Sequence, residues 1–145
     1  AGVKINLIVR GVCSLRPGIK GVRENISVRS IVGRFLEHTR VFYFANSGNP
    51  ELYLSSADLM GRNLDRRVEL IFPIEDQHWR AAIKREVLDV PMCDNVRARM
   101  LMPDGTYVRI LPSDGELIEA QTFTLQTRGK QQSKPASREA GEKPP

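Results

Sequence analysis

A nearly continuous run of β-branched and aliphatic residues at positions 3–9 (VKINLIV) constrains the fold of this chain more than any other feature. Such a run predicts a strand buried on both faces, because a strand with one solvated face alternates apolar and polar residues. Arg10 and Gly11 end the run. A strand covered on both faces needs other layers of structure against it, so a mixed α and β fold is expected.

The rest of the pattern agrees with this α+β class. A helix is expected at residues 76–88, where Asp76 is a suitable N-cap and apolar residues recur every four positions. Residues 34–38 are expected to be helical or irregular, and the pattern at 116–125 fits a helix or a strand. Further strands, joined in part by the turn sequences ANSGNP and PDGT, are expected at residues 26–31, 41–44, 52–55, 67–74, 100–102 and 107–110.

Length and composition exclude several classes of protein. The chain has 145 residues, of which 41% are hydrophobic and 27% charged, as in a globular domain or part of one. No apolar run approaches the roughly 18 residues of a membrane span. Cys13 and Cys93 stand alone, without the spacing of a disulfide framework or a zinc site, which fits a reducing cytoplasm. The first residue is not Met and a strand begins almost at once, so we expect a piece of a larger protein.

The net charge of +5 is unevenly distributed. Residues 126–145 account for +3 of it and contain no aromatic or branched aliphatic side chain, so this basic tail is expected to be disordered. The domain proper is then residues 1–125, and its net charge is only +2. Any anion-binding site in it must arise from a local arrangement of side chains.

Four side chains are candidates for such a site: Arg10, His38, Arg67 and Glu69. Arg10 follows a strand, and ligands of open α/β sheets gather at strand ends. Arg67 and Glu69 share a face of the expected strand 67–74, which suggests a pocket wall. Arginine suits phosphate because its planar fork forms paired, charge-assisted hydrogen bonds. Purely structural roles, such as an exposed salt-bridged edge or a packed histidine, remain open from the residues alone.

Four segments resemble the C-terminal part of polyphosphate kinase, over about residues 3–111: NLIVRGVCSLRPG, RENI, SIVGRFLEHTRVFYF and LYLSSADLMGRNLDRRVEL. The resemblance implies reversible transfer of the ATP γ-phosphoryl group to inorganic polyphosphate through a phosphohistidine outside this chain. It also implies Mg²⁺ with ligands outside this chain. The implied partners are ATP, ADP, polyphosphate and the remainder of the kinase chain, with homo-oligomers left open. The implied location is cytoplasmic, with attachment at the periphery of the inner membrane as an option for full-length members.

The resemblance also assigns roles to the four candidates. His38 matches the family's histidine that contacts the nucleotide phosphates and exchanges a proton, so it is the candidate catalytic residue. Arg10 matches the family's ATP-binding arginine, and Arg67 and Glu69 match residues that face the phosphate tunnel. No metal ligand is expected in this chain. Because the nucleophile lies elsewhere, the chain alone is expected to be inactive.

A more distant similarity links the chain to the phospholipase D superfamily, whose half-site reads His-x-Lys, Gly-Ser-x-Asn and Glu. Here Arg40 replaces the Lys, Ser55 the Gly and Asp58 the Asn. The likeness implies a mixed sheet flanked by helices. Two alternative functions follow: a phosphodiesterase or nuclease built from paired half-sites, and a non-catalytic basic module that binds nucleic acid.

Overall fold

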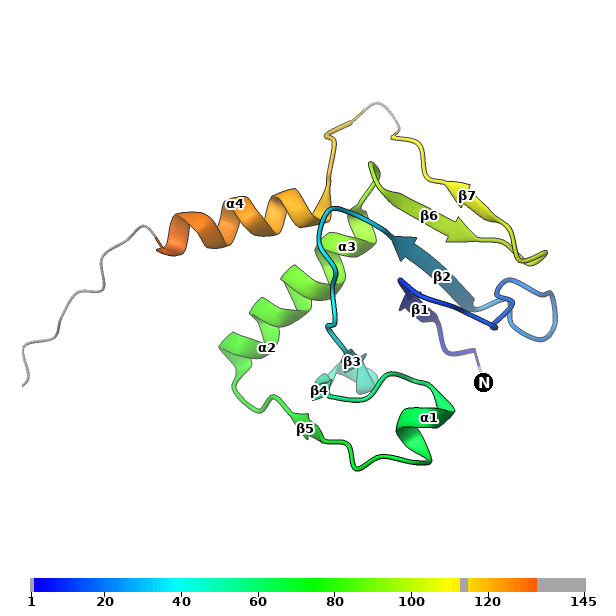
Figure 1. Ribbon diagram of the computed structural model, residues 1–145, viewed down its shortest axis with the longest axis horizontal. Coiled ribbons are helices and arrows are strands. Elements are labelled where there is room, and N and C mark those ends of the chain that lie inside the picture. The colour runs from blue at the N-terminus through cyan, green and yellow to red at the C-terminus, as the bar shows by residue number, and fades with distance from the viewer. Residues whose placement is uncertain (1, 113–114, 133–145) are drawn as a thin grey trace, which may run out of the picture.

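The computed structural model describes residues 2–112 and 115–132, and the strands in this part form two sheets (Figure 1). In the larger sheet β1 and β2 are parallel, and the other neighbouring pairs are antiparallel. The predicted mixed α+β class is therefore confirmed. The order across the larger sheet is β1 (Ile5–Ile8), β2 (Ile26–Ile31), β6 (Ala98–Leu101) and β7 (Tyr107–Arg109).

The smaller sheet is antiparallel, in the order β3 (Val41–Phe44), β4 (Glu51–Ser55) and β5 (Ile71–Pro73). The predicted hairpin between β3 and β4 is confirmed, and its turn contains the short 3₁₀ helix η1 (Asn46–Gly48). The predicted hairpin at PDGT joins β6 and β7, where Gly105 adopts the positive φ that favours glycine.

One long helix connects the two sheets (Figure 1). It runs through α2 (Gln77–Ile83), the π-helical segment η2 (Lys84–Asp89) and α3 (Val90–Cys93). The Asp76 side chain caps its start by accepting the backbone N–H of Trp79 at 2.9 Å, which confirms the predicted helix and N-cap. Near this end, Arg80 donates to the carbonyl oxygen of Pro50, just before β4. The helix thus begins against the smaller sheet.

The far end of the helix is held against the larger sheet by Arg29 of β2. Its guanidinium donates to the carbonyl oxygens of Met92 and Asp94, where α3 ends. Cationic donors are favourable at helix C-termini, where carbonyl groups lack partners within the helix. Arg29 therefore fixes how the long helix meets the sheet.

The Asp94 carboxylate organises the chain that follows. It is 1% exposed, and its Oδ1 accepts the backbone N–H groups of Val96, Arg97 and Ala98 at 2.7–3.1 Å. Its Oδ2 accepts the N–H of Ala120 at 2.8 Å, at the start of α4 (Ala120–Gln132). One side chain thus satisfies four backbone donors, two of them buried, and joins the start of β6 to the start of α4.

The segment 32–40 crosses from β2 to β3 as irregular chain, one of the two forms expected at 34–38. The Gln121 amide of α4 accepts the N–H of Phe35 at 3.0 Å and donates to the Phe35 carbonyl at 2.9 Å and to Glu37 at 2.7 Å. Gly33 permits this approach, because a Cβ there would lie 2.3 Å from the Gln121 side-chain oxygen. Helix α4 therefore anchors the segment that carries His38.

Three expectations about secondary structure are wrong. The first strand is not buried on both faces, because β1 lies at the edge of its sheet and Ile5 is exposed. The strand expected at 67–74 is only β5, because the chain is irregular after the short helix α1 (Gly61–Leu64). The tail expected from 126 starts too early, because α4 continues to Gln132. Residues 133–145 lie outside the described part.

Few apolar side chains in the described residues are fully buried, and many large ones are exposed. The buried set includes Val28, Leu52 and Leu101. The exposed set includes Val68, Leu70, Ile71 and Phe72, in and before β5. No described helix is both long and apolar enough to cross a membrane.

Replacing Asp94 by Ala should lower the free energy of unfolding by about 3 kcal/mol or more, because it leaves up to four backbone N–H groups, two of them buried, without a partner. Urea denaturation followed by circular dichroism measures this. The control is Asp89→Ala, which removes an exposed ion pair with Lys84 and should cost about 1 kcal/mol or less. Equal losses in the two variants would contradict the role of Asp94.

Replacing Gly33 by Ala should destabilise the protein by about 1–3 kcal/mol, because the new methyl group must displace the Gln121 amide from the Phe35 backbone. Amide exchange at Phe35 should become faster as well. Gly11→Ala is a matched control, since nothing lies within 4 Å of its Cβ position. The proposed anchor is incorrect if both variants are equally stable and Phe35 exchange is unchanged.

Candidate functional site

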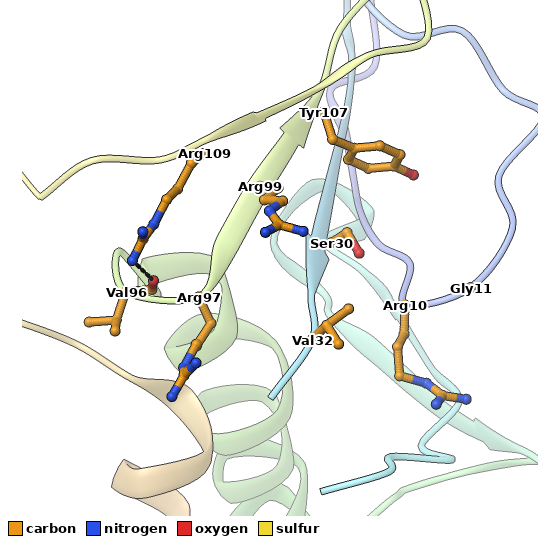
Figure 2. Close-up of a pocket in the computed structure, with 9 residues that line it drawn as sticks. All are labelled: Arg10, Gly11, Ser30, Val32, Val96, Arg97, Arg99, Tyr107 and Arg109. Carbon is orange, nitrogen blue, oxygen red and sulfur yellow. Dashed lines mark hydrogen bonds between the residues drawn. The ribbon is translucent and has the colours of Figure 1, made fainter. Parts of the chain in front are cut away.

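Arg10 leaves the larger sheet at the carboxyl end of β1 and lines a cleft of about 450 Å³ (Figure 2). Because β1 and β2 are parallel, residues that follow both strands meet at the same edge, and Val32 just after β2 also lines this cleft. The edge is the one expected for ligands in such sheets. Arg10 is exposed and makes no hydrogen bond or ion pair with another described residue.

Three more arginines line the same cleft: Arg97, Arg99 and Arg109. They come from β6, β7 and the residue just before β6, as Figure 2 shows. Arg97 pairs with Glu119 at 3.0 Å, and Arg109 donates to the Val96 carbonyl at 3.1 Å. None of the described residues that line the cleft is acidic. It is therefore a local concentration of positive charge within a domain of low net charge.

His38 lies on the irregular segment between β2 and β3, where Gln121 anchors its neighbours. The imidazole is exposed to solvent and makes no hydrogen bond or ion pair with another described residue. A ligand can therefore reach it. The segment leaves β2 at the same edge of the sheet as Arg10 leaves β1.

Arg67 and Glu69 are brought together, although not by a strand. The Arg67 Nε lies 3.3 Å from Glu69 Oε1, and the Arg67 side chain is 64% exposed while that of Glu69 is 14% exposed. The Ser56 hydroxyl donates to the other Glu69 oxygen and accepts the N–H of Leu70 at 2.9 Å. Ser56 thus holds the irregular chain after α1 against the end of β4. Arg67 contacts Glu69 through Nε, and most of its side chain remains exposed to a ligand.

Arg40 and Asp58 form a second ion pair in this region, with Nε and Oδ1 2.7 Å apart. The hydrogen bond from Arg40 lowers the pKa of the Asp58 carboxyl below its usual value, and the same bond raises the pKa of Arg40. Asn63, which is 2% exposed, adds a further hydrogen bond that lowers the pKa of Asp58. The charge of Glu69 also acts on Arg40, so these side chains form one electrostatic cluster.

The structure therefore joins two of the four predicted site residues directly. Arg67 and Glu69 are paired beside the smaller sheet, whereas Arg10 lies at the larger sheet and His38 on the connection between them. No hydrogen bond or ion pair links Arg10 or His38 to the others within residues 2–112 and 115–132. Their convergence on a single phosphate stays a prediction.

Sequence reasoning missed Arg97, Arg99 and Arg109 as site residues. A signal was present for Arg109, which lies two positions after Tyr107 in the strand expected at residues 107–110. Arg97 and Arg99 precede the strand expected at 100–102, and the structure starts β6 earlier, at Ala98. No group of three or more His, Cys, Asp or Glu side chains among the described residues could hold a metal ion.

The depressed pKa of Asp58 predicts a pH dependence. Because the folded pKa lies below the ordinary value of 3.8, the pair stabilises the protein above pH about 3.8 and loses this contribution as the pH falls through the folded pKa. The difference in unfolding free energy between wild type and Asp58→Asn should therefore shrink on acidification below pH 4. A carboxyl ¹³C titration of Asp58 with a midpoint at or above 3.8 would contradict this account.

Comparison with known proteins identifies the family. The sequence model of the family described as "Polyphosphate kinase C-terminal domain 2" matches residues 1–121. The chain is 55% identical over 128 residues to the polyphosphate kinase of Pseudomonas putida, covering 88% of this chain and 18% of that protein. It is 56% identical over 128 residues to that of Thermosynechococcus vestitus, covering 88% and 17%.

A solved structure agrees with the sequence comparison. The crystal structure of polyphosphate kinase from Porphyromonas gingivalis superposes with a TM-score of 0.79 at 36% identity, over 92% of this chain and 20% of that one. The chain thus spans about a fifth of the length of these relatives. The match supports the polyphosphate kinase interpretation over a phospholipase D-like phosphodiesterase or a nucleic-acid-binding module. The chain belongs to the polyphosphate kinase family, as its second C-terminal domain.

Proposed function

We propose that this chain supplies phosphate-binding residues for the reversible transfer of the ATP γ-phosphoryl group to inorganic polyphosphate. In this reaction the phosphoryl group moves from ATP to a histidine outside this chain, which leaves ADP. It then moves to the terminal oxygen of polyphosphate, and the reverse steps regenerate ATP. The observation that carries the proposal is the family match combined with the exposed Arg10 at a cleft whose described lining residues include no acidic side chain.

Charge neutralisation is the contribution of the arginines. Phosphoryl transfer depends mostly on positioning and on stabilising the negative charge of the transferring group. Arg10 is exposed and unpaired within the described part, and Arg67 is held by Glu69 with most of its surface accessible. Both can form charge-assisted hydrogen bonds to phosphate oxygens. Glu69 would act by orienting Arg67 rather than by touching the substrate.

His38 would contact the nucleotide phosphates and exchange a proton with them. An imidazole suits both directions of a reversible reaction because it can donate and accept protons near neutral pH. The Gln121 anchor limits the positions that the segment around His38 can adopt. In the proposal any magnesium ion that accompanies ATP is held by residues outside this chain, and no step depends on a metal ligand within it.

The remainder of a polyphosphate kinase would complete the site and cover apolar surface. Val68, Leu70, Ile71 and Phe72 are exposed beside the segment that carries Arg67 and Glu69. Exposed apolar groups in such a cluster are typical of surfaces that pack against protein. Packing there would place the rest of the enzyme next to Arg67.

The proposal can be tested in a complete enzyme in which residues 1–121 of this chain replace the matching segment of the Pseudomonas putida polyphosphate kinase. His38→Ala should lower kcat for polyphosphate synthesis by about a hundredfold or more, because it removes a proton-transfer group. Arg10→Gln should raise KM for ATP about tenfold or more, because a charge-assisted hydrogen bond is lost.

His78→Ala is the matched control, since it removes the other histidine, which packs against Trp79 on α2. It should leave kcat within about twofold of the parent, as expected for a surface side chain. The 145-residue chain alone should show no turnover. Full activity of the His38→Ala enzyme, or turnover by the isolated chain, would refute the proposal.

A further inference from the structure

The arginines of the larger sheet lie in register across two strands. Arg99 of β6 is directly opposite Arg109 of β7, and Ser30 of β2 is directly opposite Arg99 on its other side. Directly opposite residues point to the same face of a sheet. Arg97 immediately precedes β6 and lines the same cleft as Arg99 and Arg109. We name Arg97, Arg99 and Arg109 the arginine face.

The arginine face is open to a ligand. The other face of the sheet receives the long helix, since Arg29, the neighbour of Ser30 on β2, reaches the end of α3. Arg97, Arg99 and Arg109 are all exposed, and the cleft of about 450 Å³ lies over them (Figure 2). Ser30 and Tyr107 line the same cleft and bring hydroxyl groups to it.

This arrangement is electrostatically unfavourable without an anion. Like charges directly opposite each other destabilise an antiparallel pair. Arg99 has no hydrogen bond or ion pair with another described residue, and Arg109 meets only a backbone carbonyl. Among the described residues, the one carboxylate that forms an ion pair with the arginine face is that of Glu119, which contacts Arg97. A ligand carrying several negative charges would relieve the repulsion and gain charge-assisted hydrogen bonds.

The backbone spacing of the arginines favours an extended ligand. Arg99 and Arg109 leave neighbouring strands, which are about 4.8 Å apart, and Arg97 leaves the chain before β6, so the three side chains start from a surface wider than one phosphate. A linear anion with a charge on every repeating unit can bind several of these arginine side chains at the same time. Arg10 lines the same cleft, so such a chain would run on toward the proposed nucleotide phosphates.

We infer that the arginine face binds a segment of polyphosphate away from its reacting end. This rests on the proposed function and deepens it, because it gives the chain a second contact with the polymer. Binding there would hold long polyphosphate more tightly than short phosphate chains. A nucleoside triphosphate shares the same chemistry but has too few phosphates to reach from Arg10 across both strands.

The test compares two charge-matched double variants of the 145-residue chain by isothermal titration calorimetry. Arg99→Gln with Arg109→Gln removes two charges from the arginine face. Lys20→Gln with Arg85→Gln removes two exposed charges that do not line the cleft. Each protein is titrated with long polyphosphate, with inorganic tripolyphosphate and with ATP.

The arginine-face variant should bind long polyphosphate about tenfold or more weakly than the control variant, because two charge-assisted contacts are lost. The loss should be smaller for tripolyphosphate and for ATP. The variant should also remain folded, since substitution removes a repulsive pair. In thermal denaturation, long polyphosphate should raise Tm less for this variant than for the control variant.

Equal affinities of the two variants for long polyphosphate would overturn the inference, as would absence of polyphosphate binding by the unsubstituted chain. An equal loss for ATP would overturn it too, because the face would then be part of a nucleotide site. The result is separable from the proposed function. If the chimeric enzyme is active but the arginine-face variant of the chain binds long polyphosphate as tightly as the control variant, only the role of the arginine face is refuted. If the chimeric enzyme is inactive but the arginine-face variant shows the expected loss of affinity, only the proposed function is refuted.

Discussion

The buried carboxylate of Asp94 is the interaction on which the rest of this structure depends. It accepts the N–H groups that open β6 and the N–H that opens α4. The start of β6 sets which residues face the cleft, and the start of α4 sets where Gln121 meets the segment that carries His38. One desolvated charge with four donors therefore positions both the arginine cleft and the proposed catalytic histidine.

Local patterns were enough to predict much of the fold. The Asp76 cap, the turn residues of both hairpins and the apolar alternation at β2 act over a few residues, and each led to the correct element. Burial could not be predicted in the same way, because it depends on partners that are distant in sequence. The apolar first strand looked central, yet it lies at the edge of the sheet.

The site shows the same division between local and long-range information. Arginine chemistry and the family resemblance singled out Arg10, Arg67 and Glu69. Arg67 and Glu69 do lie together, but not on one face of a strand, as the sequence pattern predicted. Their pairing comes from a Ser56 hydrogen bond that closes an irregular loop. The arginine face depends on strand register across β2, β6 and β7, and register is set by tertiary structure rather than by local sequence.

The central claim is that phosphate chains bind at the edge of the larger sheet where β1 and β2 end. The most direct measurement is an NMR titration of the 145-residue chain with long polyphosphate, following the side-chain Nε–H signals of its arginines. The account predicts saturable shifts at Arg10, Arg99 and Arg109, with little change at Arg85 on the long helix. Shifts confined to Arg128 and the residues after it, with none at the cleft, would contradict it.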